Sequence, residues 1–253
     1  MNSKIKPKNR IAVLILSLTL LLGMAMFWSP NAMAASSSVI NQYNNDEKPI
    51  VDSLRASFNG SLAQTLVGRS IWYMEYGYIV YGHSKYATTG YSDCSNFVSM
   101  VYKDFGYSIT SAARKYDQVG TQVNGVYSQK ISGSQKYRLV GAEKLKPGDI
   151  FTFWALDGNG KKYISHVALY MGVVNGKPRI INTCKGNPTA IGVISDLSYW
   201  YGSNFYQVRR VLPDSAQNPG GKINDQGPVM PAKYQMKPDR PIVMPKNLVP
   251  AGF

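Results

Sequence analysis

Cys94 is the residue in this chain whose type and setting best suit covalent chemistry. It follows Ser92 and Asp93, either of which can cap a helix, and apolar residues recur after it at helical spacing as far as Gly106, where we expect the helix to end. A cysteine in a first helical turn lies among unpaired N–H groups at the positive end of the helix dipole, which favours the thiolate. The stretch therefore suggests a nucleophile, although a buried helix cysteine without a catalytic role fits the same residues.

A thiol nucleophile needs a base, and the chain offers two histidines, His83 and His166. His166 lies early in a strand expected over 163–174, which would present it rigidly, with Ile164, Ala168 and Tyr170 on the same face. His83 is expected in a loop near the mouth of the groove. A histidine on an apolar strand face can also be purely structural, so His166 is the stronger candidate base only in combination with Cys94.

Residues 1–34 have the pattern of a secretory signal peptide. Four basic residues and no acid precede an uncharged run from Ile11 to Phe27, and a small-x-small sequence ends at Ala34. We expect cleavage between Ala34 and Ala35, with an uncleaved anchor as the alternative. The segment has no cysteine, which argues against a lipidated N-terminus.

The remaining 219 residues (253 − 34) are enough for one sizeable core. Without the four basic residues of the leader, 24 Lys and Arg face 14 acids, a net charge of +10. On a secreted protein this excess points to a polyanionic surface such as a cell wall and away from nucleic acid, although charge can also serve solubility alone. Two cysteines do not make a disulfide framework.

The expected organisation is an N-terminal helical extension over 35–67, a catalytic domain over 68–212 and a Pro-rich tail over 213–253, in which eight prolines fall. Strands are expected over 150–154, 163–174, 177–183 and 206–212. Residues 108–140, rich in Gly and Ser, are expected to form loops with a short helix near Ser111–Val119.

Three blocks in order resemble the signatures of the NlpC-type papain-like cell-wall endopeptidases. They are Asp93–Val98, Leu145–Ile150 and Ser165–Gly172, and the similarity extends over about 68–212. The resemblance implies an α+β fold with the nucleophile helix packed on a central antiparallel sheet. It also implies cleavage of peptidoglycan stem peptides between D-glutamate and a diamino acid, with Cys94 as nucleophile, His166 as base and Asn182 as the third polar group.

The chain departs from the family pattern at two places. Asn96 stands where the family usually has Gly, and the family's Tyr-x-Trp-Gly-Gly segment is reduced to Ile79–His83. The substrate-contacting tyrosine is missing from its expected position, which puts peptide specificity in doubt. We place the substrate contacts at Tyr78, Tyr81, Asp93, Ser95 and Ser165.

The hairpin at Asn175-Gly176 tests Asn182 independently of the family. A strict two-residue turn would pair Leu169 with Asn182 and turn Asn182 away from His166, making Thr183 the candidate to orient the ring. A three-residue loop with a Gly bulge would set Asn182 opposite Tyr170, on the His166 face. We expect the three-residue form.

Cys184 would share a face with Asn182 and is expected to be a free thiol. Cys94, Cys184, His83 and His166 could formally bind zinc, but no two of them have close ligand spacing. We expect no metal and no cofactor.

The leading hypothesis is therefore a secreted, wall-associated, monomeric cysteine peptidase with stem peptides and anionic wall polymers as partners. The alternatives are a wall amidase or a poly-γ-glutamate hydrolase on the same fold, or a non-catalytic wall-binding protein.

Overall fold

The computed structural model describes residues 41, 43–77, 80–83, 91–183, 191–194, 198 and 202–230. They all belong to one compact unit, Ala34–Phe253. The leader, Tyr78, Cys184 and the tail beyond residue 230 lie outside the described residues. Within the described part, no helix has the length and apolar character needed to cross a membrane.

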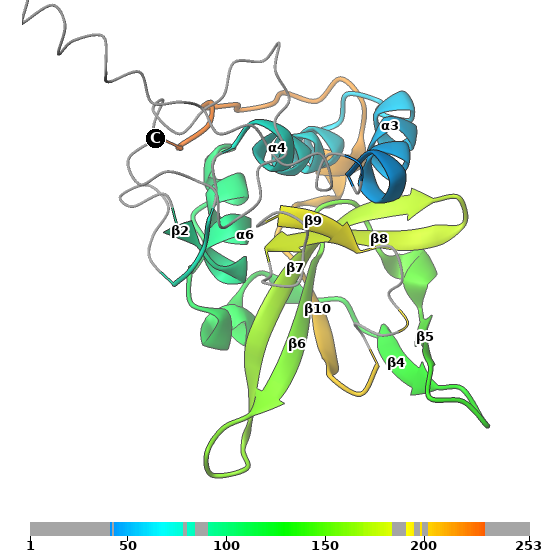
Figure 1. The fold of residues 1–253 in the computed structure, drawn as a ribbon. Helices are drawn as coiled ribbons and strands as arrows, with labels where there is room; N and C mark the ends of the chain where they lie inside the picture. The colour runs from blue at the N-terminus through cyan, green and yellow to red at the C-terminus, as the bar shows by residue number, and fades with distance from the viewer. Residues whose placement is uncertain are drawn as a thin grey trace, which may run out of the picture. The chain divides into compact units, whose positions relative to one another are not determined.

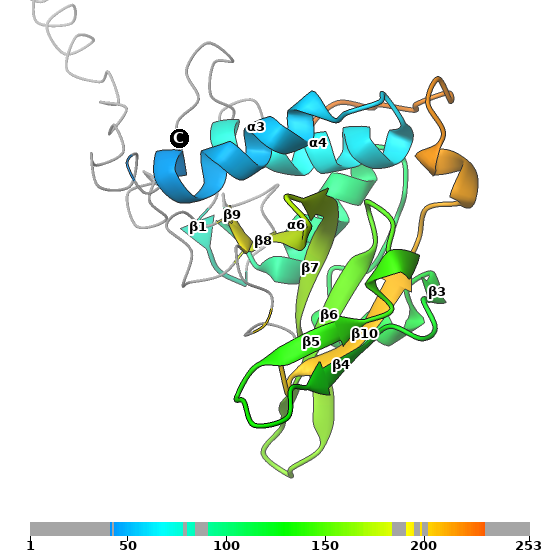
Figure 2. The ribbon, with the colours of Figure 1, turned by 90° about the vertical axis from the view of Figure 1, so that its right-hand side faces the viewer.

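A six-stranded sheet forms the centre of the fold, and every neighbouring pair of its strands is antiparallel. Its order is β3-β10-β6-β7-β8-β9; Figure 1 labels the last five of these strands, and Figure 2 labels β3 beside β10. The strands are β3 (Thr121–Gln122), β6 (Ile150–Leu156), β7 (Lys162–Val174), β8 (Lys177–Thr183), β9 (Ile191–Ile194) and β10 (Phe205–Arg210). The middle of β7 is buried on both faces, so the sheet carries packed layers on each side.

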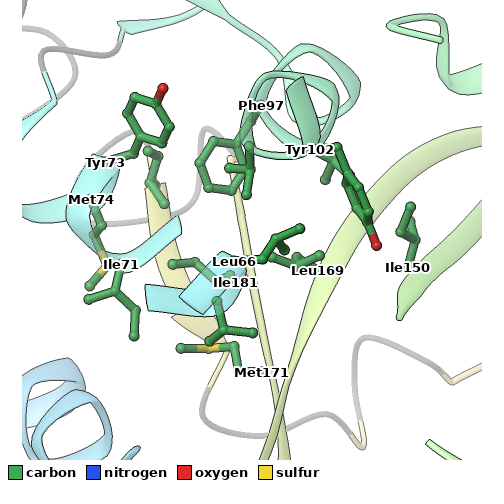
Figure 3. Packing of buried hydrophobic residues seen from close by; sticks show 14 of the residues in the cluster. Leu66, Ile71, Tyr73, Met74, Phe97, Tyr102, Ile150, Leu169, Met171 and Ile181 are labelled. Carbon is green, nitrogen blue, oxygen red and sulfur yellow. The ribbon is translucent and has the colours of Figure 1, made fainter. Parts of the chain in front are cut away.

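Helices cover one face of this sheet. They are the π-helical turn η1 (Tyr43–Glu47), α3 (Lys48–Ala56), α4 (Leu62–Tyr76) and α6 (Cys94–Lys103). Figure 3 shows Tyr73 of α4 and Phe97 of α6 in the same apolar cluster as Leu169 and Ile181 of the strands. The antiparallel sheet and the Cys94 helix packed on it confirm the expected α+β class.

The helix that carries Cys94 begins and ends where its sequence predicts. Asp93 is the N-cap, and its Oδ1 accepts from the backbone N–H of Asn96 at 2.8 Å. Gly106 adopts a φ of +82°, with its N–H bonded to Lys103 and the next N–H bonded to Tyr102. This is a Schellman C-cap, which requires a residue that tolerates the left-handed conformation.

A second hairpin, β4 (Tyr127–Lys130) with β5 (Tyr137–Val140), lies against the other face of the central sheet. It falls in the region that the sequence predicts as loops, and so does β3, while the short helix expected there is the 3-10 helix η2 (Ala113–Gln118). Tyr137 and Leu139 pack with Leu145 on the second apolar cluster. The strands have four residues each, all of them half-buried or exposed, so their apolar face becomes recognisable only in contact with the sheet.

Residues 213–230, which we call the C-terminal strap, are part of the packed structure. After the 3-10 helix η4 (Asp214–Gln217) the strap runs back past α4 (Figure 2) and ends at Met230, which is 2% exposed. The expected boundary at residue 67/68 lies inside α4, whose residues on both sides of it enter the same core. The structure therefore has no break between the extension and the domain at that point.

Candidate active site

Cys94 is the first residue of α6 and is 5% exposed. Cys94 packs in the same apolar cluster as Val167, the residue after His166 on β7, and the backbone N–H of Val167 acts to lower the pKa of the thiol. The N-terminus of α6 therefore places the sulfur directly beside the strand segment that carries the candidate base. The N–H of Cys94 itself has no partner inside its helix, as for every first helical residue.

The protonation of Cys94 differs from the expectation drawn from the helix dipole. Burial raises the pKa of the thiol to about 12, and the charge of Asp93 adds to the increase, while the Val167 N–H opposes it. The expected preference for a thiolate in the free protein is therefore wrong, because the cost of burying a charge exceeds the stabilisation from one helix terminus. Sequence cannot show this burial.

His166 is partly buried on β7, with its ring centroid 5.8 Å from that of Phe153 on β6. Burial lowers its pKa to about 4, against smaller opposing effects from Asn182 and Asp93. Cys94 and His166 are thus both neutral over a wide pH range. A neutral imidazole can accept a proton from a neutral thiol. On the β7 side, the Cys94 pocket is lined by Tyr163, Ile164 and Ser165, the residues before His166.

A β-bulge next to His166 changes which face of the sheet the preceding β7 residues point to. The register pairs Phe153 with His166 but Trp154 with Ile164, so one β7 residue is unpaired between them. Ile164 therefore joins the Cys94 cluster with Val167, while Ala168 and Tyr170 belong to the second cluster. The expectation that Ile164 shares the His166 face is wrong, because strand alternation is interrupted at the bulge.

The β7–β8 hairpin brings Asn182 to His166 by a route different from the expected one. Val174 pairs with Lys177, so the turn at Asn175-Gly176 has two residues and the three-residue prediction is wrong. A bulge further along, between Tyr170 and Gly172, shifts the register so that Leu169 pairs with Ile181.

Continuing that register places Asn182 opposite Ala168, on the face of His166. Asn182 therefore lies on the expected face. It lies opposite Ala168 and not opposite Tyr170 as predicted, and is thus two β7 residues nearer to His166. Thr183, the alternative orienter, pairs with Ile191 of the other cluster.

Asn182 fixes the ring of His166. Its Oδ1 lies 3.1 Å from His166 Nε2, and its Nδ2 donates to the carbonyl of Gly192 at 3.4 Å. A carbonyl can only accept, so the amide must present its oxygen to the imidazole, and Nε2 must carry a proton. The neutral ring then carries its acceptor lone pair on Nδ1, which is the tautomer required of a base.

Four predicted contact residues surround one pocket with Cys94. Tyr81, Asp93, Ser95 and Ser165 all line this cavity, whose volume is about 340 Å³. His83 also lies on its rim, 85% exposed, with Nδ1 3.3 Å from Asp93 Oδ2. The fold thus gathers residues separated by more than 80 positions around the sulfur, while Tyr78 lies outside the described residues.

The Ser95 hydroxyl is engaged inside the protein. Its Oγ lies 2.8 Å from the Ser111 carbonyl oxygen and 2.9 Å from Asp93 Oδ1, and the Ser95 carbonyl accepts from the hydroxyl of Tyr116 at 3.1 Å. These bonds tie the segment 111–116 to the first turn of α6. A role in positioning the pocket wall therefore stands beside the predicted substrate contact.

The second sequence block builds the scaffold of the site. Asp149 is 1% exposed and accepts from Arg210 of β10 at two oxygens, each at 2.7 Å, and from the N–H of Lys146 at 2.8 Å. Gly148, with a φ of +92°, presents its carbonyl to the buried hydroxyl of Tyr102 on α6. The turn thus connects α6 to the sheet.

The sequence analysis missed one wall of the pocket, formed by residues 111–114 and Tyr163. No spacing rule links η2 to β7, so only an alignment of many relatives could have supplied a signal. Among the described His, Cys, Asp and Glu residues, no group of three converges as a metal site.

A sequence profile described as the NlpC/P60 family matches residues 78–210, more than half of the chain. The match begins after α4 and ends at the last residue of β10, so it contains Cys94, His166 and Asn182. No curated protein sequence matches the chain.

Several solved structures are similar to part of the chain. An NlpC/P60 family protein from Bacillus cereus has 21% identity and a TM-score of 0.39, covering 60% of this chain and 40% of its own. NlpC2 from Trichomonas vaginalis has 18% identity and a TM-score of 0.43, covering 61% and 48%.

A protein from Staphylococcus aureus, described as similar to a lipoprotein of the NLP/P60 family, has 23% identity and a TM-score of 0.36, covering 60% and 42%. The chain thus spans less than half the length of each of these proteins.

Proposed function

The chain belongs to the NlpC/P60 family, and from this premise we propose that it is a cysteine peptidase of the bacterial cell wall with Cys94 as its nucleophile. Family membership supports a cell-wall peptidase-like function. The observation that carries the more specific proposal is the 3.1 Å contact between His166 Nε2 and Asn182 Oδ1, on a strand whose next residue, Val167, packs in one cluster with Cys94. A cysteine with a purely structural role would not need a histidine oriented in this way nearby.

The reaction follows from this arrangement. As the thiol attacks an amide carbonyl carbon, its proton passes to His166 Nδ1, and Asn182 Oδ1 stabilises the imidazolium through Nε2–H. The backbone N–H of Cys94 would donate to the oxyanion. Collapse of the tetrahedral intermediate breaks the C–N bond, and the leaving amine takes the proton from His166. Water, deprotonated by His166, then cleaves the thioester and regenerates the thiol.

The proposed substrate is a peptidoglycan stem peptide, cut between D-glutamate and the diamino acid, as the family resemblance implies. The proposed location is the cell wall outside the membrane. It is supported by the leader pattern of residues 1–34 and by the net charge of +10 beyond it, which suits anionic wall polymers.

The test compares the purified protein with its Cys94→Ala variant on peptidoglycan and on poly-γ-glutamate, with soluble fragments identified by mass spectrometry. We expect fragments ending at D-glutamate from the wild type and none from the variant. Intact stem peptides would instead identify an amidase, and glutamate oligomers a poly-γ-glutamate hydrolase. Wild-type digests identical to those of Cys94→Ala would refute the peptidase proposal and favour wall binding.

A further inference from the structure

One wall of the Cys94 pocket carries a cation that the reaction described above does not use. Arg114 lies on η2 and lines the pocket together with Cys94. Its guanidinium centre lies 4.1 Å from the ring centroid of Tyr163, which lines the same pocket from β7. Such stacking holds the guanidinium by one face and leaves the N–H donors along its edge available.

The position of Arg114 is fixed relative to the nucleophile. The segment that carries it is bonded at both sides to Ser95, the residue after Cys94: Ser95 Oγ lies 2.8 Å from the Ser111 carbonyl, and Tyr116 donates to the Ser95 carbonyl. Tyr116 is fully buried. Arg114 itself is exposed, but its backbone segment is held against the first turn of α6. Its charge therefore has a defined position on the wall of the Cys94 pocket.

Arg114 differs from the other arginines in the described ranges, each of which has a polar partner. Arg55 pairs with Glu75, Arg69 with Asp104 and Asp225, and Arg210 with Asp149. Arg138 donates to Gln129, Arg209 donates to backbone carbonyls, and Arg179 is also engaged. Within the same described ranges, the Arg114 guanidinium donates no hydrogen bond.

Neighbouring carboxylates do not satisfy this cation. The charge of Arg114 contributes to lowering the pKa of Asp157. However, Asp157 Oδ1 accepts hydrogen bonds from the backbone N–H groups of Asn159 and Lys161, both at 2.9 Å, and not from Arg114. Asp93 also lines the pocket, but its carboxylate oxygens are in hydrogen-bond contact with Asn96, Ser95 and His83. The pocket therefore presents an arginine edge whose natural complement is a carboxylate.

We propose that Arg114, stacked on Tyr163, binds a carboxylate carried by the substrate residue next to the scissile amide. This inference rests on the proposed peptidase function and makes it more specific. A γ-linked glutamate has this chemistry, because its side chain forms the amide and leaves its α-carboxylate free. Stem peptides and poly-γ-glutamate both supply such a group, and the amidated form of the residue does not.

The test uses two synthetic stem peptides that differ only in the γ-linked residue, D-glutamate with a free α-carboxylate or D-isoglutamine with an α-amide. We expect the wild type to cleave the carboxylate peptide with a kcat/KM higher on the order of tenfold. Arg114→Gln should reduce this ratio to about one, mainly through a lower kcat/KM for the carboxylate peptide. Arg114→Lys should keep part of the ratio, because lysine retains the charge but lacks the planar fork. A γ-glutamate oligomer assayed in parallel identifies which source of the carboxylate is preferred.

Lys115→Gln is the matched control, since it removes the same charge from the neighbouring exposed residue. It should leave the ratio unchanged, and so should Tyr163→Phe, whereas Tyr163→Leu should lower it. A wild-type ratio retained in Arg114→Gln, or lost equally in Lys115→Gln, would overturn the inference.

A binding assay separates this inference from the proposed function. Affinities of both peptides are measured for Cys94→Ala and for Cys94→Ala combined with Arg114→Gln. If the wild type cleaves neither peptide, the peptidase proposal fails, and the affinity ratio alone decides the role of Arg114. A ratio near one in Cys94→Ala would then reject it.

Discussion

At the scale of single residues, burial decides how Cys94 and His166 hold their protons. The thiol has a pKa of about 12 and the imidazole a pKa of about 4, each displaced toward its neutral form by desolvation. An ion pair would form both charges at once, and their attraction would offset part of that cost. Without substrate, both groups are therefore expected to be neutral, and under the proposed mechanism the charged pair arises during the reaction.

This state predicts the alkylation behaviour of Cys94. The iodoacetamide rate at Cys94, followed by peptide mapping to separate it from Cys184, should rise about tenfold per pH unit from pH 7 to 10, because the thiolate fraction does so below a pKa of 12. The Cys94→Ala variant identifies the signal of Cys184. A rate that is already constant below pH 8 would contradict a neutral pair and indicate a preformed thiolate–imidazolium.

Asn182→Asp tests the partner of His166. A carboxylate at this position favours the imidazolium, so it should raise the His166 pKa and move the acid limb of the kcat/KM profile to higher pH. Asn182→Ala should lower kcat/KM by at least about tenfold through loss of the tautomer, without that upward movement. Identical profile shapes for both variants would show that Asn182 only packs beside the ring.

At the scale of elements, Asp104 joins two helices and the C-terminal strap. It follows α6, is fully buried, and accepts from Arg69 Nη1 at 2.9 Å, from the Tyr73 hydroxyl at 2.7 Å and from the Val229 N–H at 2.8 Å. Its carbonyl accepts from the Gln226 N–H at 2.8 Å. The strap thus donates a hydrogen bond to the Asp104 carboxylate, in addition to those that it receives from Arg69 and Tyr73 of α4.

Asp104→Asn should therefore lower the free energy of unfolding by roughly 3 kcal/mol, because it removes the charge that several buried donors face. Asp225→Asn is the matched control: Asp225 pairs with the same Arg69, but its side chain is 41% exposed, and the loss should stay below about 1 kcal/mol. Urea denaturation measures both. Equal losses for the two variants would refute the central role assigned to Asp104.

At the scale of the whole molecule, Glu47 connects the N-terminal segment to the far edge of the sheet. It is 3% exposed, and its Oε1 accepts from the Val193 N–H on β9 at 3.3 Å. Burial raises the Glu47 pKa to about 7. Because the folded protein holds this proton more tightly than the unfolded chain, the contribution of Glu47 to stability is fully present below about pH 4.5 and is lost as pH rises to about 7.

Glu47→Gln should remove this pH dependence. At pH 8 the variant should exceed the wild type by up to about 3 kcal/mol in free energy of unfolding, and the difference should shrink toward pH 4.5. Chemical denaturation across this range, with the difference taken at each pH, isolates Glu47 from the other carboxyls. A difference that stays constant with pH would show that Glu47 is ionised in the folded protein throughout.

Features that depend on local pattern could be predicted from the amino-acid sequence alone. Helix signals at Asp93 and Gly106 set the Cys94 helix, and apolar runs between turn residues identified the strands that became β6, β7, β8 and β10. The ordered blocks around Cys94 and His166 indicated the family. These signals are local because caps, turns and strand alternation act over a few residues.

Features that depend on contacts between distant segments became visible only in the folded protein. The bulges in β7 set which face His166 and Asn182 share, burial reversed the expected thiol protonation, and η2 brought Arg114 to the pocket. The β4–β5 hairpin and the strap also become ordered against the core rather than by their own sequence pattern. Desolvation and strand register are properties of the packed molecule, because both depend on the segments that pack against a residue and not on its neighbours in the sequence.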